Sequence, residues 1–284
     1  QTMIEVIKSG LYSTIQDCGR FGFENLGVPN SGPMDMFSAS LSNKLIGNKK
    51  DDAVIEITMT GPLLKFHRKT IVSITGADIS PTINNKKIKI NSLYTLNKND
   101  ILGFGKLNYG FRSYIAVNGG FQTHKILNSR CMYENITESF RIKDGDLLKI
   151  KKTNRKNYLN PLIFEYKKQF SSFIIDVYKG PEYGFLSKIE KNFLLNNEFS
   201  ISNLNNRMGY QLNENINNKI KPIISSIVLQ GTVQLTPSGK LIILMRDNQT
   251  TGGYPRILQL SNDSINKLSQ KHTGDKIHFN LIDY

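Results

Sequence analysis

The sequence contains only two cysteines, Cys18 and Cys131, and no tryptophan among its 284 residues. Two cysteines exclude a disulfide scaffold, and a chain of this length buries enough apolar surface to fold without one. No run approaches the roughly 20 apolar residues that cross a membrane. Residues 1–6 lack the basic and apolar regions of a signal peptide. Together these features predict a cytoplasmic protein of about two domains.

Arginine is also scarce, because it accounts for only 9 of the 37 basic residues, although the net charge is +14. Arginine makes the bidentate contacts on which much nucleic-acid recognition depends, and no zinc-finger, KH or RNP motif is present. We therefore expect no nucleic-acid partner and interpret the densest basic run, residues 149–156, as a solvated linker. The positive charge favours anionic substrates or an acidic partner through long-range attraction.

Most segments have the composition of short β-strands, rich in β-branched and aromatic residues and bounded by Gly, Asn, Pro or Asp. The expected strands include residues 70–79, 112–117, 172–177, 223–234 and 240–245. Thr236-Pro237-Ser238-Gly239 predicts a hairpin turn between the last two. Helices are expected at residues 34–46, 183–195 and 261–271. The pattern predicts a mainly β protein.

A turn residue followed by Asp and an alternating strand occurs three times. These aspartates are Asp100, Asp146 and Asp275. Convergent turn chemistry explains the repeat, which is also compatible with two related β units. The basic, Asn-rich residues 151–160, followed by Pro161, form the best boundary between such units. We therefore expect an N-terminal unit over residues 1–150 and a C-terminal unit over residues 160–284.

Common catalytic motifs are absent, since the sequence has no Gly-x-Ser-x-Gly elbow, His-Glu-x-x-His pair or Cys-x-x-Cys pair. Residues 27–32 have the outer glycines of a phosphate loop, but Pro33-Met34 stands where such a loop has Lys followed by Ser or Thr. The four histidines lack metal-ligand spacing, so we expect no metal site. Cys18 has no histidine nearby in the sequence, which disfavours a nucleophilic role.

Four segments combine glycine with groups that bind anions or transfer protons. They are residues 14–35, 114–130, 206–210 and 247–255. Three arginines can clamp a carboxylate or phosphate, namely Arg20, Arg130 and Arg207. Three aspartates can act as bases, namely Asp17, Asp35 and Asp247. Each segment also has a structural interpretation, such as a turn with an internal Asp–Arg pair, a tight Asn-Gly-Gly turn or a buried strand end.

In this order the segments resemble the biotin-dependent carboxyltransferase-like family. This KipA-like family is also described as allophanate hydrolase subunit 2 and includes the C subunit of 5-oxoprolinase. The motifs that carry the resemblance are residues 14–20 (TIQDCGR), 27–35 (GVPNSGPMD), 56–62 (EITMTGP), 76–78 (GAD), 114–120 (YIAVNGG), 129–130 (SR), 206–210 (NRMGY), 231–234 (GTVQ) and 250–255 (TTGGYP). The chain departs from the family at Gln230, where Pro is usual, and at residues 135–140, which are poor in glycine.

The resemblance implies two cyclophilin-like β-barrel units, corresponding to carboxyltransferase-like subdomains C and D. Family members act in urea carboxylase, in ATP-dependent 5-oxoprolinase, or as antagonists of a histidine-kinase inhibitor. This chain shows no biotin-carboxylase extension and no Met-Lys-Met site for covalent biotin, which favours the C subunit of 5-oxoprolinase. Such a protein opens 5-oxoproline to glutamate with ATP as co-substrate, together with the A and B subunits. A KipI-like B subunit is the expected direct partner, while a urea or amide carboxyltransferase and a non-catalytic regulator stay open as alternatives.

Lactam opening requires a base for water and a cation for the substrate carboxylate. Under the resemblance, we expect Asp247 to be the base or to orient the water, with Asp17 as the second candidate. We expect Arg20 or Arg207 to bind the substrate carboxylate.

The same reaction requires donors for a developing oxyanion or for phosphate. We expect these donors to be the Thr250 and Thr251 hydroxyls and the backbone N–H groups of Gly252 and Gly253. Further substrate-binding candidates under the resemblance are Arg130, Asn118 and Tyr254. All these residues are expected to converge in one cavity.

Overall fold

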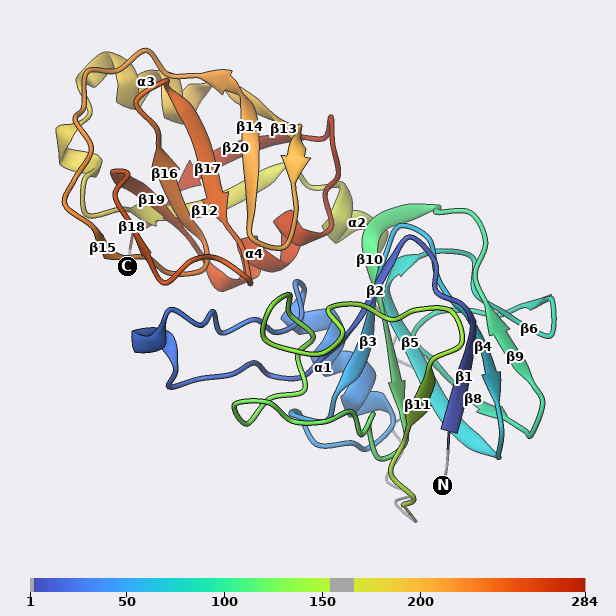
Figure 1. Ribbon diagram of the computed structural model, residues 1–284. Coiled ribbons are helices and arrows are strands. Elements are labelled where there is room, and N and C mark those ends of the chain that lie inside the picture. Colours follow the sequence, from blue (N-terminus) through green and yellow to red (C-terminus); the bar gives the residue numbers. More distant parts are fainter. Residues whose placement is uncertain (1–2, 154–165, 284) are drawn as a thin grey trace. The chain divides into compact units, whose positions relative to one another are not determined.

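The computed structural model describes residues 3–153 and 166–283, and the chain divides into two compact units (Figure 1). The first unit contains Gln1–Arg20 and Ser31–Gln169, and the second contains Phe21–Asn30 and Phe170–Tyr284. Strands predominate in both units, so the prediction of a mainly β protein is confirmed. Most of the predicted linker, residues 154–160 with Pro161, lies outside the described residues.

Two antiparallel sheets make up the first unit, with strand orders β11-β1-β4-β9-β6-β7 and β2-β3-β10-β5-β8. The strands of the first sheet are β1 (Met3–Lys8), β4 (Leu63–Phe66), β6 (Thr82–Ile83), β7 (Lys86–Lys87), β9 (Ile101–Gly103) and β11 (Leu147–Lys149). The strands of the second sheet are β2 (Tyr12–Gln16), β3 (Val54–Thr58), β5 (Thr70–Asp78), β8 (Ser92–Leu96) and β10 (Tyr109–Val117). One apolar core draws buried side chains from both sheets.

Helix α1 (Met36–Leu45) covers the other face of the second sheet, against β3, β5 and β10 (Figure 1). Strand β3 shows how the sequence accommodates two buried faces. Ile55 and Ile57 belong to the main core, whereas Val54 packs with Ala39 and Ile46 beside the helix. Because successive side chains of a strand point to opposite faces, a strand covered on both sides is apolar without alternation.

The start of α1 differs by two residues from the predicted helix 34–46, because Asp35 is its N-cap. The Asp35 carboxylate accepts hydrogen bonds from the backbone N–H and the hydroxyl of Ser38, at 3.0 and 2.6 Å. This contact satisfies an otherwise unpaired donor of the first turn. Asp35, considered above as a base, therefore stabilises the helix start. Gly47 follows the helix with a φ of 71°, which glycine adopts at little cost.

The second unit is a closed barrel with the strand order β12-β19-β16-β17-β14-β13-β20. Its strands are β12 (Ile174–Lys179), β13 (Glu198–Asn205), β14 (Gly209–Asn215), β16 (Thr232–Leu235), β17 (Lys240–Leu244), β19 (Arg256–Leu260) and β20 (Lys276–Leu281). A parallel pairing of β12 with β20 closes the barrel. The predicted hairpin at residues 236–239 is confirmed, since β16 and β17 pair antiparallel across that turn.

The predicted single strand over residues 223–234 is wrong. It divides into β15 (Ser226–Ile227), which pairs with β18 (Thr251–Gly252), and β16 of the barrel. Gly231 interrupts it with a φ of 84°, outside the range of a strand. The predicted helix 183–195 is a short 3₁₀ turn followed by α3 (Lys188–Asn196), and the predicted helix 261–271 is α4 (Asn262–Ser269). Helix α2 (Tyr166–Ser171) was not predicted.

The three recurring aspartates form the same local turn. Each carboxylate accepts a hydrogen bond from the backbone N–H three residues earlier, at 2.6 Å for Asp100, 2.8 Å for Asp146 and 2.9 Å for Asp275. Local side-chain bonds of this kind are what makes Asp favourable in turns. The repeat therefore has the turn chemistry expected of it.

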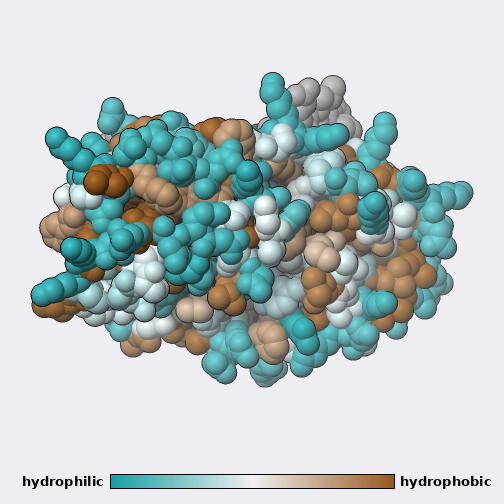
Figure 2. Space-filling view, turned by 90° about the horizontal axis from the view of Figure 1, so that it is seen from above, coloured by the Kyte–Doolittle hydropathy of each residue, from teal (hydrophilic) through white to brown (hydrophobic). Residues whose placement is uncertain are grey.

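The face shown in Figure 2 mixes hydrophilic and apolar side chains, as on most protein surfaces. The described residues include no helix that has both the length and the apolar character to cross a membrane.

Candidate functional site

Asp17 follows β2 and ties that strand end to the segment around Ser129. One carboxylate oxygen accepts a hydrogen bond from the Ser129 hydroxyl at 2.6 Å and from the Gly19 N–H at 3.1 Å. The other oxygen accepts from the Arg130 N–H at 2.6 Å. Asp17 is 8% exposed, so its charge is stabilised mainly by these donors. These hydrogen bonds join two of the glycine-containing segments, residues 14–35 and 114–130, at one corner of the first unit.

Arg20 is 1% exposed and lies in the same corner. Its guanidinium donates to the Cys131 carbonyl at 2.6 Å and to the Ser31 hydroxyl at 3.4 Å. Asp17 and Arg20 do not form an ion pair with one another. The interpretation of this segment as a turn held by an internal Asp–Arg pair is therefore wrong. Burial, together with the charge of Asp17, raises the pKa of the Cys131 thiol. The thiol therefore stays protonated, 3.2 Å from the carboxylate.

Arg130 links this corner to the Asn-Gly-Gly turn. Its guanidinium donates to the Gln122 side-chain oxygen at 2.8 Å and to the Thr123 carbonyl. The Gln122 amide in turn donates to the carbonyls of Gly119 and Gly120, at 3.2 and 3.3 Å. The turn that contains Asn118 is therefore connected to Asp17 through Gln122 and Arg130.

In the second unit, Arg207 and Asp247 form a buried ion pair. The guanidinium donates to both carboxylate oxygens, at 2.7 and 3.1 Å, and the two side chains are 7% and 8% exposed. Strand pairing brings them together, because Gly209 of β14 lies opposite Leu244 of β17. Residues just before β14 and just after β17 therefore meet at the same end of the barrel. A substrate carboxylate would have to displace Asp247 to occupy the same face of Arg207.

The glycine-containing segment of residues 247–255 continues from this pair as an extended ribbon. The carbonyl of Thr250 accepts from the Val228 N–H at 3.1 Å, and that of Gly253 accepts from the Ile223 N–H at 2.9 Å. Thr251 is exposed on β18, and Tyr254 is 40% exposed. The hydroxyl and the phenol predicted to bind substrate are thus accessible, on a ribbon paired with β15.

Gln234 and Gln249 lie beside Gly252 and were not among the predicted site residues. Gln249 donates to the Gln234 side-chain oxygen at 3.4 Å. The Gln234 amide nitrogen is buried and has no hydrogen-bond partner among residues 3–153 and 166–283. A Cβ at Gly252 would lie 2.6 Å from this nitrogen, so a larger residue there would require the Gln234 side chain to shift. The signal available in the sequence was the position of Gln234 in the GTVQ motif, to which no role had been attached.

The predicted residues form two groups. The first unit brings together Asp17, Arg20 and Arg130, with the Asn118 turn connected through Gln122. The second unit contains the remaining candidates, namely Arg207, Asp247, Thr250, Thr251, Gly252, Gly253 and Tyr254. A single cavity formed by all these residues would have to include residues of both units. The expected convergence of the residues in one cavity therefore stays a prediction. Across residues 3–153 and 166–283, no group of three or more His, Cys, Asp or Glu side chains is arranged to hold a metal ion.

The sequence model of the carboxyltransferase domain, subdomains A and B, matches residues 26–281. The chain belongs to this family, which confirms the resemblance. It is 30% identical to the 5-oxoprolinase C subunit of Escherichia coli (strain K12) over 287 residues, which cover 98% of this chain and 90% of that protein. Urea amidolyase of Lachancea kluyveri is 41% identical over 130 residues, covering 45% of this chain and 7% of that protein.

Solved structures show the same fold. The protein TTHA0988 superposes with a TM-score of 0.89 at 24% identity, over 98% of this chain and 55% of the other. The K. lactis urea amidolyase gives a TM-score of 0.87 at 26% identity, over 99% of this chain and 19% of the other. The chain thus spans about half of TTHA0988 and about a fifth of the amidolyase, but nearly the full length of the Escherichia coli protein.

Proposed function

We propose that this protein is the C subunit of an ATP-dependent 5-oxoprolinase, which opens 5-oxoproline to L-glutamate in a complex with the A and B subunits. The observation that carries the proposal is the extent of the match. The 5-oxoprolinase C subunits of Escherichia coli and Haemophilus influenzae align over 98% and 99% of this chain and over 90% and 91% of their own lengths. The proposal includes a cytoplasmic location, ATP as co-substrate of the complex and a KipI-like B subunit in direct contact with this chain.

The reaction begins with a poor electrophile, because the lactam carbonyl is stabilised by its nitrogen. Transfer of the terminal phosphoryl group of ATP to the lactam oxygen releases ADP and activates the carbon. One water adds there and gives a proton to a base, the C–N bond breaks, and the nitrogen takes up a proton. A second water releases phosphate and leaves glutamate. The protein must therefore supply donors for phosphate and developing oxyanions, and a group that orients water.

The end of the barrel near β18 provides such groups in our proposal. The Thr251 hydroxyl is exposed on β18, within the glycine-rich motif proposed to cradle the oxyanion or phosphate. Asp247 is held by Arg207 through two hydrogen bonds. This pair fixes the start of the loop that leads to Thr251, and we assign Asp247 the orientation of water.

The test is a glutamate-release assay on the chain co-expressed with the A and B subunits. We expect release from 5-oxoproline only when ATP and all three subunits are present. Thr251→Val should lower the rate by roughly 10²–10³, the usual cost of a lost oxyanion donor. Thr95→Val, at another exposed strand position, is the matched control and should leave the rate unchanged. Equal rates for the two variants would exclude Thr251 from the site.

A second function has specific support in the urea amidolyase matches, with 41% identity over 130 residues. As a carboxyltransferase, the chain would move a carboxyl group from biotin on a partner to an amide nitrogen. Carboxylation of urea by the complex with a biotinylated partner, without glutamate release, would favour this function over lactam opening.

A further inference from the structure

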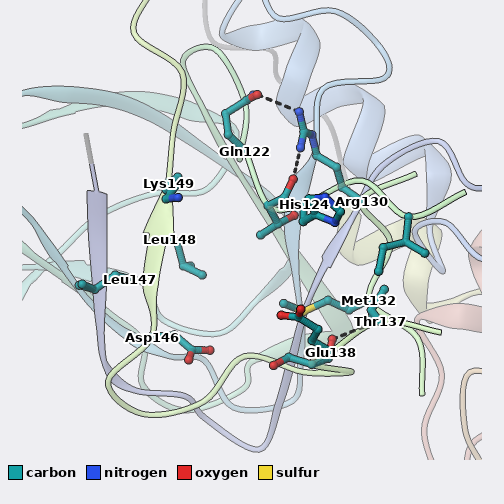
Figure 3. A pocket seen from close by; sticks show the side chains of 13 residues that line it. Gln122, His124, Arg130, Met132, Thr137, Glu138, Asp146, Leu147, Leu148 and Lys149 are labelled. Carbon is teal, nitrogen blue, oxygen red and sulfur yellow. Dashed lines mark hydrogen bonds between the residues drawn. The ribbon is translucent and has the colours of Figure 1, made fainter. Parts of the chain in front are cut away.

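The second unit has an open groove of about 910 Å³ between residues 185–190, which include the start of α3, and residues 217–223. Apolar side chains line much of this groove, among them Phe185, Ile189 and Ile220. The cavity of the first unit is different, because charged side chains of both signs line it (Figure 3). The groove is thus an apolar feature that the candidate site does not explain.

Two side chains of the groove are far more exposed than a large apolar residue usually is. Ile189 is 83% exposed and Phe185 is 65% exposed. The apolar surface continues along the chain after Ile223, since Ile224 and Ile227 are 93% and 70% exposed. Single exposed apolar residues are ordinary, whereas a patch of several marks a surface that another molecule covers.

Hydrogen bonds hold both walls of the groove in place. On one wall, Ser187 and Glu190 form the capping box that fixes the start of α3. On the other wall, the Ile223 N–H donates to the Gly253 carbonyl at 2.9 Å. A surface whose walls are already fixed loses little conformational entropy when a partner binds to it. The groove is therefore preorganised for docking.

The rim of the groove is positively charged. Lys188, Lys219 and Lys221 are exposed, and none of the three has an ion-pair partner in the described chain. The one carboxylate that lines the groove, that of Glu190, accepts the Ser187 N–H at 2.6 Å. Charges at the rim of an interface attract a partner of the opposite sign and speed its association. The groove therefore favours an acidic partner over a second copy of this chain, whose net charge is also +14.

We propose that this groove is a docking surface for another subunit of the complex, and that the docked segment carries apolar side chains flanked by Asp or Glu. The apolar side chains cover Phe185 and Ile189, and the carboxylates face the three rim lysines. The chemistry of the segment rests on the groove itself, whereas its source in a subunit of the complex rests on the proposed function.

The docking surface borders the ribbon on which Thr251 lies. Ile227 of β15 stands directly opposite Thr251 of β18 in the pairing of these two strands. A subunit that covers the exposed side chain of Ile227 therefore also lies beside the residue to which we assign the oxyanion or phosphate contact. This position gives a structural reason for activity that requires a partner.

Calorimetric titration tests the proposal, with the purified A and B subunits added separately to the full chain. We expect at least one subunit to bind, with an affinity that falls as the salt concentration rises, because salt screens the rim lysines. In that complex, hydrogen exchange should slow at residues 185–190 and 217–229. Binding of neither subunit, protection confined to other segments, or self-association of the chain through this groove would overturn the proposal.

Ile189→Asp is the first variant. It places a negative charge in the groove, and it suits the first turn of α3, where the helix dipole favours an acidic side chain. We expect subunit binding to weaken by at least about tenfold. Leu147→Asp makes the same change at a leucine of the first unit that is 54% exposed (Figure 3), and it should leave binding unchanged.

The double variant Lys219→Glu with Lys221→Glu tests the charge of the rim. We expect it to weaken subunit binding by about tenfold at low salt and much less at high salt. Lys98→Glu with Lys106→Glu reverses two exposed lysines of the first unit and controls for the change in net charge. Equal effects of the two double variants, or binding that is insensitive to Ile189→Asp, would refute the docking surface.

The inference and the proposed function fail in distinguishable ways. Subunit binding that the groove variants weaken, without glutamate release in the three-subunit complex, refutes the 5-oxoprolinase function and leaves the docking surface standing. Normal glutamate release, with subunit binding unaffected in the groove variants, refutes the docking surface and leaves the function standing.

Discussion

The buried pair of Arg207 and Asp247 allows a sharp prediction about stability. Asp247→Asn removes the negative charge but keeps the shape, and so leaves a guanidinium that is 7% exposed without its counter-ion. Loss of one partner of a buried ion pair typically costs about 3–5 kcal/mol. Because Asn retains one acceptor for the guanidinium, we expect the lower end, about 3 kcal/mol. Removing both charges with Arg207→Met and Asp247→Leu should cost much less than the sum of the single changes.

Equilibrium urea unfolding of the full chain measures this loss, and hydrogen exchange of β14 and β17 amides assigns it to the second unit. The exposed pair Lys276 and Glu198, with side chains 67% and 48% exposed, is the matched control. Glu198→Gln should change the free energy of unfolding far less than Asp247→Asn does, because exposed ion pairs contribute little to stability. If Asp247→Asn costs no more than Glu198→Gln, the burial argument for this pair is refuted.

Three further predictions follow from packing and burial. A Cβ at Gly180 would lie 2.2 Å from the Arg256 carbonyl oxygen, whereas one at Gly184 would meet nothing within 4 Å. Thermal unfolding should therefore show that Gly180→Ala costs about 1–3 kcal/mol and Gly184→Ala less than about 0.5 kcal/mol, and equal costs would contradict the close approach. Because burial raises the pKa of the Cys131 thiol, an aromatic disulfide reagent at pH 8 should modify this residue only after unfolding, as followed by mass spectrometry, and rapid labelling of the native chain would show the thiol to be accessible. Burial also raises the pKa of the Tyr114 phenol well above its ordinary 10.0. The Cys131 thiol and the Tyr114 phenol are therefore both protonated in the folded chain and ionise more readily when the chain unfolds. The free energy of unfolding should thus be steady near pH 8 and fall as the pH rises past the ordinary values of 9.0 and 10.0, and stability that increases over this range would contradict the assignment.

Features of the fold that depend on neighbouring residues were predictable from the sequence. The turn at residues 236–239 has Pro and Gly at positions that suit one hairpin. The helix over residues 188–196 begins at Ser187, whose hydroxyl and backbone make the two reciprocal bonds of a capping box with Glu190. The predicted strand over residues 223–234 is wrong because its apolar composition gives no sign of the break at Gly231. In the folded chain, pairing with β19 and close packing against Ile265 define that break.

The candidate site was predictable only as a set of motifs. Asp17, Arg130, Arg207 and Asp247 stand out in the sequence because charged groups sit beside glycine after apolar strands. Their partners do not stand out. The sequence offered Asp17 as a base and Arg207 as a carboxylate clamp, whereas the structure shows each engaged with a group far along the chain.

Local chemistry and ordered motifs in the sequence were enough to determine the β-rich architecture, the hairpin turn at residues 236–239 and the family. These depend on backbone preferences and on residues a few positions apart, which a single sequence displays directly. Only the tertiary structure decided that Ser129 reaches Asp17 across 112 positions and that Arg207 pairs with Asp247 across 40. The physical reason is that strand register and loop packing, rather than spacing along the chain, determine which polar groups meet.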